Sequence, residues 1–210
     1  MRNLPKKFND FQYLLSKIGL SFFRGIFNFI FFKKGSKIPF LGMNIKFICR
    51  KNISFGSFVW LGHHGYLDAF SKNGVSFGNN VTVREFFVIQ CRSGLNPAGD
   101  SLIIKDNTFI GPFCKIGVGG NITIGSNCQI GAYCSLNAES HKKYNGAYTS
   151  GKISRKGILI GDNVWIGDGV IILDGVSIGS NSVIGAGSLV TKSIPKNTIA
   201  FGIPAKKKRT

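Results

Sequence analysis

The chain has 210 residues and is 43% hydrophobic, which is enough for one domain with its own core and argues against intrinsic disorder. It has 27 basic and 9 acidic residues, a formal net charge of +18, so we expect an anionic partner such as nucleic acid, anionic lipid or a phosphate-bearing cofactor or substrate. The five cysteines show neither a paired framework nor metal-ligand spacing, which disfavours disulfides and a metal site and favours a reducing cytoplasm.

The N-terminal segment, residues 1–52, is basic and contains a predicted helix. Residues 8–32 place apolar side chains every three or four positions, a period typical of an amphipathic helix. Lys17 and Arg24 interrupt the apolar run, which disfavours a spanning helix, although a tilted signal anchor stays open. Basic flanks and many phenylalanines favour a helix lying on an anionic membrane surface. The alternative is that the helix caps the following domain or packs on a neighbouring subunit.

The period changes to six in residues 53–206, with an irregular beginning and clear register from Ile104 onward. A period of six is neither helical nor simple strand alternation, so it indicates a structural repeat. Two inward residues per unit fit one short strand and one turn, and three units would close a triangular coil stacked at the ~4.8 Å spacing of paired strands. The sequence therefore predicts a mainly β, parallel β-solenoid. Its most regular inward positions are Ile160, Ile166, Ile172, Ile178, Ile184 and Val190.

One excursion interrupts the repeat at residues 137–157, and residues 207–210 form a basic tail. Long loops on a rigid scaffold are where binding and catalytic residues concentrate. His141 stands at the start of this excursion, and histidine is the natural general base for activating a hydroxyl group. We interpret His63 and His64 as structural or acceptor-lining residues.

Three short motifs connect the repeat to a known family: VWIG at 164–167, IGAGS at 184–188 and GIPAK at 202–206. With the repeat, they resemble the left-handed β-helix (hexapeptide-repeat) acyltransferases, and within these the sugar and polysaccharide O-acetyltransferases. The left hand is implied by the resemblance, because crossover connections are otherwise right-handed. Ile203 departs from the family's usual ending, which reads Gly-Asn-Pro-Ala-Lys.

The resemblance implies an O-acetyltransferase that moves acetyl from acetyl-CoA to a sugar hydroxyl of a cell-surface polysaccharide or its lipid-linked precursor, without a metal. It also implies a homotrimer. Three of the site residues that the resemblance implies also have an alternative role. Trp165 could make a subunit contact, Asn137 could cap a turn, and Glu139 could orient the imidazole. The implied site residues are His141 as general base, Asn137 and Glu139 at the acceptor, and Trp165, Ala186, Gly187, Lys192, Pro204, Ala205, Lys206 and Lys207 at coenzyme A.

Two other function classes remain open at this point. The acceptor could be small, such as serine, an amino sugar or a free oligosaccharide, or the solenoid could be a non-catalytic scaffold or basic binding protein. Nucleic acid is not expected as a partner, because the sequence shows no recognition helix and no basic and aromatic surface of known pattern. We expect a cytoplasmic protein at the inner face of the cell membrane, held there through residues 8–32.

Overall fold

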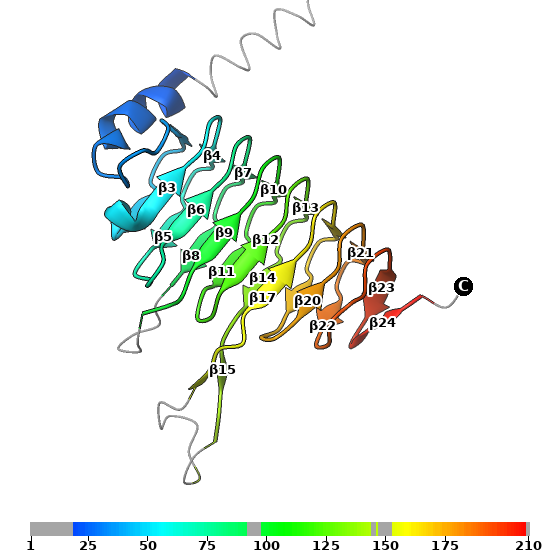
Figure 1. Ribbon diagram of the computed structural model, residues 1–210. Helices are drawn as coiled ribbons and strands as arrows, with labels where there is room; N and C mark the ends of the chain where they lie inside the picture. Colours follow the sequence, from blue (N-terminus) through cyan, green and yellow to red (C-terminus); the bar gives the residue numbers. More distant parts are fainter. Residues whose placement is uncertain (1–18, 92–97, 144–145, 147–152, 209–210) are drawn as a thin grey trace, which may run out of the picture.

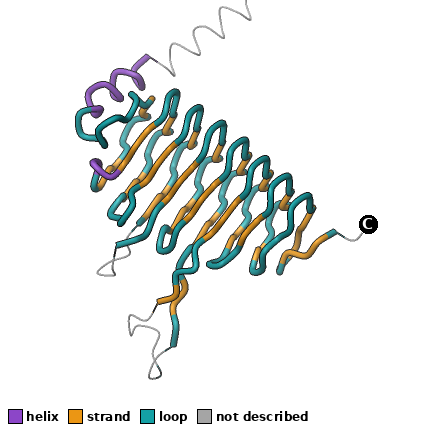
Figure 2. Tube along the Cα trace, viewed as in Figure 1, coloured by secondary structure: helices purple, strands orange, loops and turns teal. Residues whose placement is uncertain are grey.

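The computed structural model describes residues 19–91, 98–143, 146 and 153–208. Triangular coils stack along one axis from the N-terminal to the C-terminal end (Figure 1). The coils from β1 to β20 contribute one short strand to each of three sheets, in which successive coils pair in parallel, and loops turn the corners between them (Figure 2). The predicted fold class, a mainly β left-handed parallel β-helix, is confirmed.

The three faces of the solenoid are three sheets, here called A, B and C. Sheet A contains β1 (Phe40–Leu41), β4 (Trp60–Leu61), β7 (Thr82–Val83), β10 (Phe109–Ile110), β13 (Gln129–Ile130), β18 (Trp165–Ile166), β21 (Val183–Ile184), β23 (Ile199–Gly202) and β24 (Ala205–Lys207). Sheet B contains β2 (Lys46–Ile48), β5 (Tyr66–Asp68), β8 (Val88–Gln90), β11 (Lys115–Gly117), β14 (Ser135–Asn137), β19 (Ile171–Ile172) and β22 (Leu189–Val190). Sheet C contains β3 (Ile53–Phe55), β6 (Val75–Phe77), β9 (Leu102–Ile104), β12 (Ile122–Ile124), β17 (Ile158–Ile160) and β20 (Ser177–Ile178).

The core is the column of inward side chains, and its register follows the six-residue period. In the regular coils from Ile160 to Ile194, the residue that opens each hexad is buried, and the residue four positions later is buried beside it. Apolar burial of this kind drives folding, because it removes aliphatic surface from water. Ser182 and Ser188 are also inward, and their hydroxyls donate to the carbonyl oxygens of Pro195 (2.9 Å) and Gly185 (2.6 Å).

The solenoid begins at β1, earlier than the predicted residue 53. Leu41, Phe47 and Phe55 open the first three units, opposite Leu61, Leu67 and Phe77 of the next coil. Before β1, a helix over residues 19–29 lies against the N-terminal end of the stack. A 3-10 turn, Arg50–Asn52, connects β2 to β3. Phe32 is buried over that end, with its ring 5.3 Å from Phe47 and 4.9 Å from Phe55. The segment therefore caps the open core.

The glycines that follow the hexad aliphatics serve close packing rather than tight turning. Gly125 keeps an ordinary backbone conformation, but a Cβ there would lie 2.4 Å from the carbonyl oxygen of Gly161 in the next coil. Gly125 is therefore required by the close approach of the next coil and not by a left-handed turn. The left-handed conformation at one corner is instead adopted by a column of asparagines, Asn80, Asn107, Asn127, Asn163, Asn181 and Asn197, most of which are linked by amide hydrogen bonds of 3.1–3.2 Å.

Aromatic residues occupy the same left-handed position at the corner between sheets A and B. The rings of His64, Phe86, Phe113 and Tyr133 stack with centroids 5.1, 4.8 and 4.9 Å apart. The neighbouring His63 accepts a hydrogen bond at Nδ1 from the backbone amide of Met43, at 3.1 Å. Both histidines therefore make structural contacts at this corner.

The excursion leaves the coil after Ala138 as an antiparallel hairpin. Its described strands are β15 (Ser140–His141) and β16 (Ile153–Ser154), and His141 pairs with Ile153. The hairpin projects away from the stack (Figure 1). On the return, the carboxylate of Asp174 accepts hydrogen bonds from the backbone amides of Lys156 and Gly157, each at 2.8 Å, which fixes the chain as it re-enters sheet C.

Candidate active site

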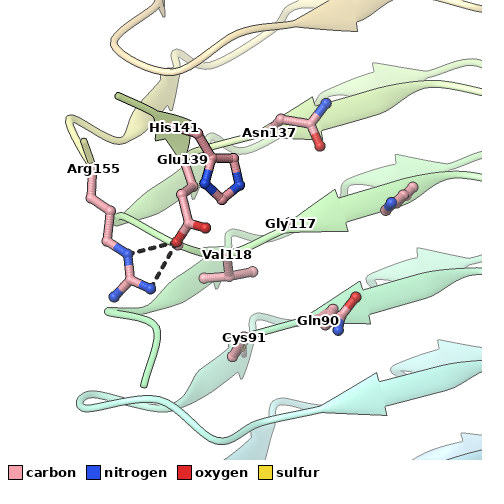
Figure 3. Close-up of a pocket in the computed structure, with 10 residues that line it drawn as sticks. Gln90, Cys91, Gly117, Val118, Asn137, Glu139, His141 and Arg155 are labelled. Carbon is pink, nitrogen blue, oxygen red and sulfur yellow. Dashed lines mark hydrogen bonds and ion pairs between the residues drawn. The ribbon is translucent and has the colours of Figure 1, made fainter. Parts of the chain in front are cut away.

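A polar pocket lies where β8, β11 and β14 end and the hairpin begins. Its volume is about 250 Å³. Successive coils of sheet B and the hairpin supply its walls (Figure 3). The polar side chains that line it are Gln90, Lys115, Asn137, Glu139, His141 and Arg155.

The parallel register of sheet B builds the floor of this pocket. Gln90, Gly117 and Asn137 are direct partners on β8, β11 and β14. Because Gly117 has no side chain, it leaves space between the two amides, and a Cβ there would lie 3.4 Å from Oδ1 of Asn137. The Asn137 amide donates to the hydroxyl of Ser135 at 3.0 Å. Asn137, which was expected at the acceptor, thus lines the pocket with its amide held in place.

An ion pair forms the wall next to the hairpin. Arg155, directly after the return strand β16, donates through Nε to Oε2 of Glu139 at 2.8 Å, and its Nη2 lies 2.7 Å from the same oxygen. Arg155 also donates through Nη1 to the carbonyl oxygen of Ala98, at 2.8 Å. Both charged side chains are largely buried. Glu139 thus holds Arg155, which ties the base of the hairpin to the segment before β9.

His141 is exposed to solvent and lines the same pocket as Asn137 and Glu139. Figure 3 shows its imidazole on the pocket side of the hairpin, beside the carboxylate of Glu139. The structure therefore brings together the three residues predicted for catalysis and acceptor binding. Gln90, Lys115 and Arg155 were not predicted, because coil stacking brings the first two to the pocket and the hairpin return brings Arg155, and neither leaves a local motif.

Cys91 also lines the pocket, but its thiol is a poor nucleophile. Burial raises the pKa of Cys91 to about 12, so the thiol stays protonated at neutral pH. Burial likewise raises the pKa of Cys128. These thiols favour a reaction without an acyl-cysteine intermediate. Among the described residues, no cluster of three or more His, Cys, Asp or Glu side chains is arranged to hold a metal ion.

The residues expected at coenzyme A lie on the C-terminal coils, away from this pocket. Trp165 on β18 is 57% exposed and points outward, as its place in the hexad predicts. Ala186 and Gly187 are exposed at the corner after β21, and Lys192 is exposed after β22. The terminal hairpin of β23 and β24 carries the other four, Pro204, Ala205, Lys206 and Lys207. None of these eight is among the described residues that line the pocket.

Residues 157–192 match the family model described as bacterial transferase hexapeptide (six repeats). Residues 157–192 therefore carry the transferase hexapeptide repeat. The match spans the most regular coils, and the same coil geometry continues on its N-terminal side to β1. No curated protein matches the chain.

Solved structures give three further comparisons. A hexapeptide-repeat acetyltransferase from Vibrio cholerae is 36% identical over 52% of this chain and 61% of its own, with a TM-score of 0.49. The chain thus spans less than two thirds of that relative. A maltose O-acetyltransferase from Clostridium difficile 630 is 27% identical over 89% of this chain and 74% of its own, with a TM-score of 0.49. The N-acyltransferase AntD from Bacillus cereus, in complex with dTDP and 3-hydroxybutyryl-CoA, is 19% identical over 89% and 87%, and its TM-score of 0.58 supports the shared fold.

Proposed function

We propose that the chain is an acetyl-CoA-dependent O-acetyltransferase whose acceptor is a sugar hydroxyl of a cell-surface polysaccharide or its lipid-linked precursor. The observation that carries this proposal is the pocket that His141 lines together with the amides of Gln90 and Asn137. Amide groups both donate and accept hydrogen bonds, so they suit a substrate rich in hydroxyl groups. The transferase hexapeptide of residues 157–192 supports acyl transfer as the reaction.

His141 acts as the general base in this reaction. Its imidazole takes the proton from the acceptor hydroxyl while the hydroxyl oxygen attacks the thioester carbonyl carbon, because an unassisted alcohol is a weak nucleophile at neutral pH. Collapse of the tetrahedral intermediate breaks the carbon–sulfur bond, and the imidazolium returns its proton to the departing thiolate. The products are the acetyl ester and the free thiol of coenzyme A. The residues proposed to hold coenzyme A are Trp165, Ala186, Gly187, Lys192, Pro204, Ala205, Lys206 and Lys207.

Incubation with labelled acetyl-CoA and a panel of glycans tests the proposal. We expect one acetyl group to appear in ester linkage on a sugar, detected by mass spectrometry and removed by mild alkali. Serine, amino sugars and free oligosaccharides belong in the panel as small acceptors. Label that appears only in amide linkage would contradict O-transfer, and the absence of transfer to every acceptor would contradict the proposed activity.

We also propose a homotrimer in which a neighbouring subunit completes the substrate cleft. The hairpin of β15 and β16 extends beyond its own coils, and the stacked ring column at the corner of sheets A and B exposes aromatic area that a neighbour would bury. We expect light scattering to give three times the chain mass of 22.9 kDa. A fully active monomer would contradict a shared cleft.

A further inference from the structure

The N-terminal helix docks on the solenoid through its polar face. Arg24 donates through Nε to the carbonyl oxygen of Leu41 at 2.8 Å and through Nη2 to the hydroxyl of Ser21 at 3.0 Å. Asn28 accepts a hydrogen bond from Nη1 of Arg50 at 3.0 Å. Gly25 lies so close to the chain that an added Cβ would meet the carbonyl oxygen of Pro39. Polar and small residues thus occupy the side of the helix that normally carries the apolar stripe.

The apolar face of the same helix therefore points away from the protein. Phe23 is 58% exposed, and Phe27 and Ile30 are each 78% exposed. With Leu20, which is also exposed, these residues are spaced three, four and three apart, so they form one continuous stripe at the helical period. Contiguous exposed apolar surface of this kind marks an interaction site.

The sequence on both sides of this stripe is basic and has no acidic residue. From residue 11 to residue 67 the sequence contains no Asp or Glu, while it contains eight basic residues: Lys17, Arg24, Lys33, Lys34, Lys37, Lys46, Arg50 and Lys51. The side chains of Lys33, Lys34 and Lys37, directly after the helix, are exposed. The guanidinium of Arg50 lies 5.5 Å from the ring centre of Phe31, so positive charge also adjoins the apolar residues.

An exposed apolar stripe next to basic residues favours one kind of binding partner. A second copy of the chain docked through the same face would bring two basic surfaces together at close range, which is unfavourable. An anionic bilayer satisfies both features, because its headgroups attract lysines and its acyl boundary accepts aromatic and aliphatic side chains. Among the described residues, no helix is long and apolar enough to cross a membrane.

We propose that residues 20–37 form a docking surface for an anionic lipid bilayer, with Leu20, Phe23, Phe27 and Ile30 inserted at the headgroup boundary and Lys33, Lys34 and Lys37 on the phosphates. The polar face stays bound to the first coils, so the solenoid is held at the membrane by its N-terminal end. This places the protein at the inner face of the cell membrane, next to a lipid-linked acceptor. The binding itself does not depend on the proposed acetyl transfer.

Co-sedimentation of the full chain with vesicles tests the docking surface. We expect binding to phosphatidylcholine vesicles that contain about 30% phosphatidylglycerol to exceed binding to pure phosphatidylcholine by about tenfold or more, and to fall as salt is raised. The triple variant Phe23→Ser, Phe27→Ser, Ile30→Ser should lose about tenfold or more of this binding. These side chains are exposed, so the variant should retain the circular dichroism spectrum of the parent.

Two matched controls distinguish docking through this surface from non-specific binding to vesicles. The exposed solenoid residues Ile103, Leu159 and Ile171, each changed to Ser, should leave vesicle binding within about twofold of the parent. Replacement of Lys33, Lys34 and Lys37 by Gln should remove the preference for anionic lipid, whereas Lys105, Lys156 and Lys196 changed to Gln should keep it. Unchanged vesicle binding by the Phe23, Phe27 and Ile30 variant would overturn the proposal. So would a fall in its mass by light scattering, because the stripe would then join copies of the chain.

Discussion

Replacement of His141 by alanine should lower kcat by at least ~10²-fold at saturating acceptor, because general-base catalysis contributes ~10² to 10⁴ in rate. His141 lines the pocket with Asn137 and Glu139, and burial raises the pKa of the Cys91 thiol in the same pocket, so that thiol is not a ready nucleophile. The affinity for coenzyme A should stay near the parent value, because the residues proposed to hold it lie on other coils. Steady-state kinetics with acetyl-CoA, together with calorimetric titration of coenzyme A, measure the two effects separately.

His63→Ala and His64→Ala serve as matched controls for this variant. Both side chains make contacts at the corner of sheets A and B, and neither lines the pocket among the described residues. Each should therefore keep kcat within a small factor of the parent, although loss of the stacked His64 ring should reduce thermal stability slightly. If His141→Ala kept more than about a tenth of parental turnover, the general-base role would be wrong, given the ~10² lower bound for such a base.

The repeat was predictable because its period is set by coil geometry and recurs many times. Ile160, Ile166 and Ile172 could be placed inward from spacing alone, and all three are buried. Partners along the sheets follow from the same register. The role of Gly125 was not predictable in the same way, because the atom that excludes a Cβ belongs to Gly161, which is 36 residues away on the next coil.

The candidate site was predictable only in part, for a similar reason. His141 could be singled out by its position after a coil strand, at the start of the break in the repeat. Arg155 could not, because its contacts are Glu139 across the hairpin and the carbonyl oxygen of Ala98, which is 57 residues distant in sequence. Gln90 and Asn137 lie on strands that do not pair with each other, and each residue is the partner of Gly117 on the strand between them, β11.

The N-terminal helix shows what periodicity leaves undetermined. The pattern of residues 8–32 predicted two faces, and residues 8–18 lie outside the described chain. Over residues 19–29 the period is confirmed, but it cannot say which face meets the protein. Gly25 is the informative residue, since a position without a side chain in the polar stripe allows the backbone of Pro39 to approach closely.

Replacement of Gly125 by alanine should destabilise the solenoid by about 3 kcal/mol and lower Tm by about 6–12 °C, because the new methyl group would overpack two coils that cannot separate locally. The Cβ would lie 2.4 Å from the carbonyl oxygen of Gly161, while the Gly125 amide is bonded to the carbonyl oxygen of Ile160 at 2.9 Å. Gly117→Ala is the matched control: its nearest neighbour is the side-chain oxygen of Asn137 at 3.4 Å, and its Tm should stay nearly unchanged. Both variants gain the same reduction in unfolded-chain entropy, so the difference between their calorimetric Tm values isolates the close contact. Equal Tm values would show that the glycine after the hexad aliphatic is not required by coil stacking.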